Sequence, residues 1–117
     1  MSKSLSRLYQ LSGNNSEITF DVGFGEQQHG VTTIMLNDKL LVNNHEGPLG
    51  FSLGYSDELK NKTIYCTSTV RSYSGESYTT RLRYKISGGL IPLYETLEES
   101  VNGKGEIVIY TAEFFFY

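Results

Sequence analysis

The stretch IVIYTAEFFFY, residues 107–117, decides the fold class that this sequence predicts. Its residues alternate between two sets, as they do in a β-strand, where successive side chains point to opposite faces. One set is apolar or aromatic throughout: Val108, Tyr110, Ala112, Phe114 and Phe116. We expect this set to face a core, because alternating strands bury their apolar side. The chain end is therefore predicted to be held in a sheet.

The opposite face of this strand supplies the first candidate binding surface. Its apolar members are Ile107, Ile109, Phe115 and Tyr117. Apolar side chains that no other part of the chain covers mark contact sites for partners. We expect Phe115 and Tyr117 to lead such a contact, with Ile107 and Ile109 beside them.

The rest of the chain repeats this pattern in short alternating segments between Gly, Asn, Asp and Ser residues. A loop is expected at 23–30, where glycines cluster. Strands are expected at about 5–11, 17–22, 32–36, 39–42, 49–55, 64–74, 77–86, 93–101 and 106–116. Eight or nine strands joined by short hairpins predict an all-β fold, an antiparallel β-sandwich. A partly closed β-barrel is the alternative.

The segment TTIMLNDKLLV, residues 32–42, predicts a hairpin. Asn37 and Asp38 suit a two-residue turn that needs positive φ at both positions. In that register Leu36 lies opposite Lys39, Met35 opposite Leu40 and Ile34 opposite Leu41. Both faces are largely apolar, so we expect both to be covered.

A second hairpin is predicted by VRSYSGESYTTRLRYK, residues 70–85. Gly75-Glu76 fits a two-residue turn with glycine first, which places Tyr73 opposite Tyr78. The same register extends down both strands. It pairs Thr69 with Leu82, Thr67 with Tyr84 and Tyr65 with Ile86.

Residues 93–101 fit two structures. Leu93, Leu97 and Val101 recur every four residues, as in a short helix, and they also share one face of a strand. The Asn-Gly that follows favours a hairpin with the C-terminal strand through a loop at 102–105. In that hairpin Val101 lies opposite Glu106, Leu97 opposite Tyr110 and Leu93 opposite Phe114.

Two histidines and a glutamate form a weak candidate metal site. If the first hairpin kept its register, His29 would lie opposite Glu46 and His45 opposite Gly30. Two imidazoles and a carboxylate can hold zinc with one position open, or can carry out acid–base chemistry. Histidines in loops are more often ordinary surface residues.

Basic and aromatic residues form secondary binding candidates. Arg81, Arg83 and Lys85 alternate along one strand and make a basic stripe, which could meet an acidic partner or phosphate. The plainer interpretation is a solvated sheet face, or an edge strand charged against edge pairing. Tyr73 and Tyr78 are further candidates at the tip of the second hairpin.

Composition limits the possible classes of protein. The 117 residues suit one domain, 1–117, and the net charge of −3 disfavours non-specific nucleic-acid binding. No apolar run is long enough for a membrane-spanning helix, and the first residues lack the apolar run of a secretory signal. The single cysteine, Cys66, suits a reducing compartment and is expected to be a packed side chain. We therefore expect a cytoplasmic protein that does not insert into membranes.

No catalytic motif stands out, and the serines lack the Gly-x-Ser-x-Gly elbow of hydrolases. We expect a non-enzymatic module without cofactors that binds protein. Self-association is favoured, and an inhibitor or immunity-type binding protein fits the same pattern. The alternative is a carbohydrate- or small-ligand-binding β-sandwich, in which exposed tyrosines stack on the ligand.

Overall fold

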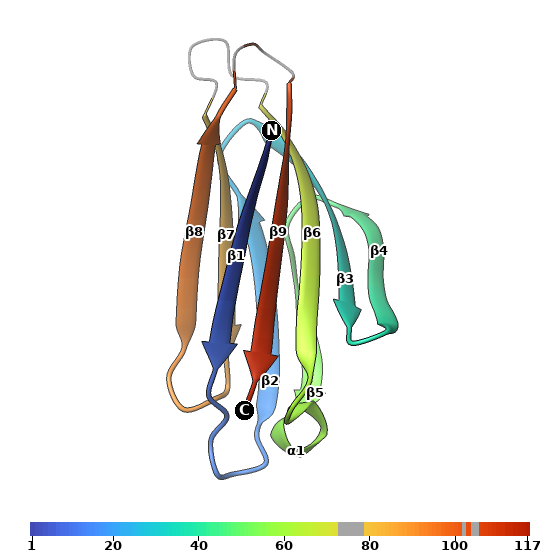
Figure 1. Cartoon of the computed structure of the whole chain (residues 1–117), viewed down its shortest axis with the longest axis vertical. Helices are drawn as coiled ribbons and strands as arrows, with labels where there is room; N and C mark the ends of the chain where they lie inside the picture. Colours follow the sequence, from blue (N-terminus) through green and yellow to red (C-terminus); the bar gives the residue numbers. More distant parts are fainter. Residues whose placement is uncertain (73–78, 102, 104–105) are drawn as a thin grey trace.

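The computed structural model describes residues 1–72, 79–101, 103 and 106–117, which form nine strands in two packed sheets (Figure 1). The five-stranded sheet A has the order β1-β9-β6-β3-β4, and the four-stranded sheet B has the order β5-β2-β7-β8. The strands are β1 (Ser2–Tyr9), β2 (Glu17–Phe24), β3 (Gln28–Leu36), β4 (Lys39–Glu46), β5 (Leu49–Tyr55), β6 (Thr63–Ser72), β7 (Thr79–Ser87), β8 (Leu93–Ser100) and β9 (Ile107–Phe116). The predicted β-sandwich is confirmed.

The boundaries differ from the predicted ones at the N-terminal end. The first strand covers Ser2–Tyr9 rather than 5–11, and β2 and β3 leave only residues 25–27 of the glycine-rich loop outside strands. One short helix, α1 (Ser56–Leu59), follows β5. Across the residues described, no helix has the length and apolar character needed to cross a membrane.

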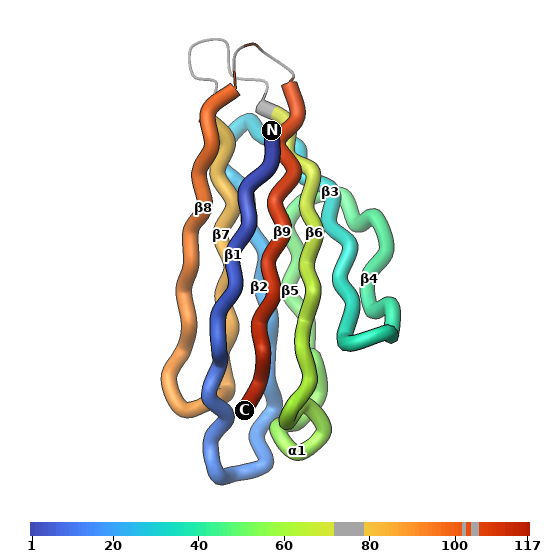
Figure 2. Tube along the Cα trace, viewed as in Figure 1, coloured from blue at the N-terminus to red at the C-terminus, as the bar shows by residue number. Residues whose placement is uncertain are grey.

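The chain end lies inside sheet A. Strand β9 pairs in parallel with β1 on one side and antiparallel with β6 on the other. Figure 2 shows β1 and β9 side by side although they come from opposite ends of the chain. Tyr117 donates its backbone N–H to the Tyr9 carbonyl at 3.1 Å, and Leu11 donates its N–H to the Tyr117 carbonyl at 2.8 Å. The expectation of a tied C-terminus is confirmed.

The alternation in β9 builds the core. Its inward residues, from Val108 to Phe116, are all buried. The ring of Phe114 meets Phe20 and Tyr84 from sheet B, with ring centroids 5.8 Å and 5.5 Å apart. Aromatic pairs of this kind add to the burial of apolar area that holds two sheets together.

The predicted hairpin between β6 and β7 is wrong, because the two strands belong to different sheets. Thr69 lies opposite Ile109 on one side and Val31 on the other, and Leu82 lies opposite Leu97. The turn expected at 75–76 falls outside the described residues. Residues suited to a tight turn also suit a connection between layers, so long-range packing decides which of the two forms.

The predicted hairpin between β8 and β9 is wrong for the same reason. Residues 93–100 do form a strand rather than a helix, but this strand pairs with β7 in sheet B. Tyr110 lies opposite Ser68, not Leu97. The face assignment is confirmed, since Leu97 and Val101 are buried and Leu93 is partly buried against the core.

The hairpin between β3 and β4 is confirmed near its turn, where Leu36 lies opposite Lys39 and Met35 opposite Leu40. Farther along, register shifts place Ile34 opposite Val42 instead of Leu41. The expectation that both faces are covered is wrong. Strand β4 is the edge of sheet A, and Leu40 is 51% exposed.

Candidate functional site

The four candidate contact residues of β9 share its outer face but do not form one patch. Ile107 and Ile109 are 39% and 43% exposed, Tyr117 is 46% exposed, and Phe115 is partly buried beside Leu8 of β1. Eight residues separate Ile109 from Tyr117, which is roughly 26 Å along a strand. Two separate surfaces therefore take the place of the single patch expected.

The end of β9 next to Tyr117 lies at a hollow of about 360 Å³, which we call the C-terminal corner. Its most exposed side chains come from β1, the β7–β8 loop and β8, and they are between 57% and 71% exposed. These side chains are Leu8, Leu90, Ile91 and Tyr94. The corner thus joins the edge of sheet A to the edge of sheet B.

Backbone contacts fix the β7–β8 loop at this corner. Leu90 donates its N–H to the Gln10 carbonyl at 3.0 Å, and Gly89 donates to the Tyr9 hydroxyl at 2.9 Å. Gly88 has φ of +103°, and a β-carbon there would clash with the Glu17 carbonyl. The loop is therefore docked on the end of β1, which holds Leu90 near Leu8.

Two further contacts join the edge strands above the corner. The Nε of Arg7 on β1 lies 2.9 Å from a carboxylate oxygen of Glu95 on β8. Lys3 donates from Nζ to the Glu98 carbonyl at 2.8 Å. Both pairs are exposed and contribute little to stability, but they bring β1 and β8 together across the open side of the sandwich.

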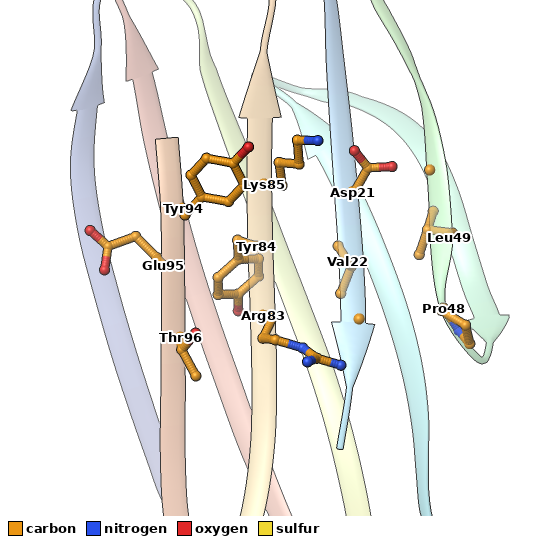
Figure 3. A pocket seen from close by; sticks show the side chains of 12 residues that line it. Asp21, Val22, Pro48, Leu49, Arg83, Tyr84, Lys85, Tyr94, Glu95 and Thr96 are labelled. Carbon is orange, nitrogen blue, oxygen red and sulfur yellow. The ribbon is translucent and has the colours of Figure 1, made fainter. Parts of the chain in front are cut away.

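A second hollow, of about 550 Å³, lies on the outer face of sheet B (Figure 3). We call it the sheet B groove. It crosses β5, β2, β7 and β8, and its side walls carry charged and aromatic residues. The residues that give the groove its chemistry are Asp21, Gly23, Gly50, Arg83, Lys85, Tyr94 and Thr96.

Charged side chains from neighbouring strands lie over two strand glycines on the floor of the groove. Arg83 lies over Gly23, with its Nε 3.9 Å from the position of a β-carbon there, and it donates from Nη2 to the Phe24 carbonyl at 3.1 Å. On the next strand, the Asp21 carboxylate fills the space that a side chain at Gly50 would need. Glycine inside a strand often marks such a close approach.

The basic stripe predicted on β7 divides between two environments. Arg83 and Lys85 line the groove, and the Lys85 ammonium lies 5.5 Å from the centre of the exposed Tyr94 ring. Arg81 instead forms an ion pair with Glu98 at 2.6 Å, outside the groove. The interpretation of an edge strand is wrong, because β7 lies between β2 and β8.

The histidine site is not formed as predicted. Register shifts in β4 place Glu46 opposite Val31 and His45 opposite Thr32, while His29 lies opposite Arg71 of β6. Asn44 adopts a left-handed φ of +50° where the register shifts. In the part of the chain that the structure describes, no group of three or more His, Cys, Asp and Glu side chains is placed to hold a metal ion.

Two remaining candidates, Tyr73 and Tyr78, lie outside the described residues. Cys66 is buried between the sheets, as expected of a packed thiol. Burial raises its pKa to about 12, and a weak contact with the Ser68 hydroxyl lowers it less. A thiol with this pKa is a poor nucleophile near neutral pH.

Sequence reasoning missed the residues that make both hollows. Leu90 and Ile91 stand between Gly88-Gly89 and Pro92, so two large apolar residues occupy a turn, where polar residues are usual. Gly23 and Gly50 interrupt strands, which signals a bulge or a close approach. These signals mark unusual residues in the sequence, but only the order of the strands in the sheets shows which of these residues share a surface.

The fold is a β-sandwich with one hollow at a corner and another on the outer face of sheet B. Comparison with protein-family models, curated proteins and solved structures finds no match.

Proposed function

We propose that this chain is a non-enzymatic protein-binding module that self-associates through the C-terminal corner. The observation that carries the proposal is the gathering of five exposed apolar and aromatic side chains around one hollow: Leu8, Leu90, Ile91, Tyr94 and Tyr117. Exposed apolar clusters mark interaction sites, and large apolar side chains that enter a pocket supply most of the affinity of an interface.

The shape of the corner favours a second copy as the partner. Ile91 projects with 71% of its surface exposed beside a hollow that could receive such a side chain. Across a two-fold axis, the Ile91 of each copy would enter the hollow of the other. Most homodimers use this kind of interface, in which one patch meets itself.

Charge also suits contact between two copies. Arg7 and Glu95 carry opposite charges beside the corner, one on each edge strand. Because each copy presents both signs of charge at this rim, two copies need not repel each other there.

Sedimentation velocity over a range of protein concentrations tests the proposal. We expect a reversible dimer of the wild-type chain that Ile91→Asp converts to a folded monomer. Ile107→Asp is the matched control, because it places the same charge on an exposed isoleucine at the opposite end of β9. A wild-type monomer at millimolar concentration, or dissociation by Ile107→Asp instead of Ile91→Asp, contradicts the proposal.

A further inference from the structure

We infer that the sheet B groove is a binding site for a sugar that carries one carboxylate, such as a short oligosaccharide with a single uronate residue. The groove shares Tyr94 with the C-terminal corner, but the inference does not rest on the self-association proposed above. Its volume of about 550 Å³ lies within the range of pockets that bind small ligands.

The charges in the groove select a ligand with one negative group. Arg83 and Lys85 face the hollow with two positive charges, and Asp21 faces it with one negative charge. Glu95 also lines the hollow, but its carboxylate points away from it toward Arg7 (Figure 3). A dense polyanion would be repelled by Asp21 and by the net charge of −3, whereas a single carboxylate can pair with the Arg83 guanidinium.

Asp21 specifies hydroxyl groups on the same ligand. A carboxylate accepts hydrogen bonds and donates none, so a favourable partner for it must present donors. Sugar hydroxyls are such donors. A ligand with both hydroxyls and one carboxylate therefore satisfies Asp21 and Arg83 together.

Tyr94 provides the apolar face that a sugar ring needs. Its ring is 68% exposed on the outer face of β8, and it lies on the same row across the sheet as Lys85 and Asp21. Tyrosine combines a large apolar ring with a polar end, which suits contact with the apolar face of a sugar. Thr96 adds a hydroxyl one row away, opposite Arg83.

The arrangement is in place before a ligand arrives. The Phe24 carbonyl holds one nitrogen of Arg83 at 3.1 Å, and the side chain lies over Gly23. A guanidinium has five N–H donors, so this single contact leaves others for a carboxylate. Preorganised groups lose less conformational entropy on binding.

Isothermal titration calorimetry with a trisaccharide that contains a single galacturonate residue tests the inference. The titration uses both wild type and Ile91→Asp, so that self-association cannot hide the groove. The methyl-esterified trisaccharide has the same rings without charge, and an N-acetylated, C-amidated Gly-Glu-Gly peptide has the single charge without sugar rings. We expect the uronate to bind with a Kd of about 1 mM or tighter, and at least about tenfold tighter than either comparison ligand.

Two arginines on β7 give a matched pair of variants. Arg83→Gln is expected to weaken uronate binding about tenfold or more, because it removes a charge-assisted contact in the groove. Arg81→Gln removes the same charge from the same strand outside the groove, and it is expected to leave the Kd within about twofold. Equal loss in the two variants would overturn the inference.

Three other results would also overturn it. These are the absence of uronate binding up to 10 mM (about 2.7 kcal/mol), equal binding of the ester, and stronger binding of the peptide. The last result would assign the groove to acidic protein segments. A dimer in sedimentation without uronate binding would leave the proposed function intact and reject the groove site alone.

Discussion

The carboxylate of Asp21 on β2 occupies the space directly above Gly50 on β5, so a β-carbon at position 50 would clash with Oδ1 of Asp21. The two residues lie opposite each other in sheet B, at one side of the groove. Glycine at this position therefore decides where the acidic group of the groove lies.

Gly50→Ala is expected to push the Asp21 side chain aside and to weaken uronate binding several-fold. The fold should persist, because the clashing atom is the end of a side chain that can move. Gly23→Ala is the control, since a β-carbon there makes ordinary contacts with Arg83 at 3.9 Å and 4.0 Å. Calorimetry on both variants makes the comparison, and equal effects would show that the clash at Gly50 is not the cause.

Two buried tyrosines predict opposite effects on stability. The Tyr110 hydroxyl is hydrogen-bonded to the Thr80 side chain and to the Thr80 carbonyl. The Tyr84 hydroxyl is buried with no partner among the described residues. An unpaired buried hydroxyl costs free energy, whereas a paired one contributes about 1 kcal/mol.

Tyr84→Phe should therefore raise the free energy of unfolding by about 1 kcal/mol, and Tyr110→Phe should lower it by about the same amount or more. Urea denaturation followed by circular dichroism measures both changes. A loss of stability in Tyr84→Phe as large as that in Tyr110→Phe would mean that the Tyr84 hydroxyl has a partner in solution.

Stability should fall at alkaline pH because Cys66 is buried. Its pKa is about 12 in the fold, against 9.0 for an ordinary thiol, so only the unfolded chain ionises between these values. The stabilisation that comes from keeping this thiol protonated is complete below pH 9.0. It is lost as pH rises toward about 12, where the free energy of unfolding falls by about 1.4 kcal/mol per pH unit.

Cys66→Ala should make the free energy of unfolding fall less steeply with pH. Urea denaturation from pH 8 to 10.5 measures this slope, and the difference between the two proteins should approach the value for one proton. Burial also raises the pKa of Tyr9, Tyr84 and Tyr110, but these tyrosines are present in both proteins, so the difference between the two slopes isolates the thiol. Equal slopes in wild type and Cys66→Ala would contradict the assignment of this pH dependence to Cys66.

The sequence predicts which side of a strand faces the core better than it predicts which strands pair. The alternation in β9 gives the correct core set, because burial depends only on which side of the strand a residue occupies. The pairing of β6 and β8 does not follow from local turn signals, since the residues of a turn also suit a crossing between sheets. The corner depends on the parallel contact of β1 with β9, which joins the two ends of the chain.

The same limit explains why the predicted positions of the histidines were wrong. The turn at Asn37-Asp38 sets the register of β3 and β4 only as far as Met35 and Leu40. Beyond that point the irregularities in β4 move His45 and Glu46 by two positions, a change that keeps side chains on the expected face and alters their partners. Turn chemistry alone carries no information about such shifts.

The central claim, self-association through the C-terminal corner, is tested most directly by nuclear magnetic resonance on dilution of the isotope-labelled chain. We predict that amide shifts that change with concentration cluster at Leu8, Leu90, Ile91 and Tyr117, while those of Ile107 and Ile109 stay constant. Spectra that do not change with concentration, or changes confined to Ile107 and Ile109, would contradict the claim.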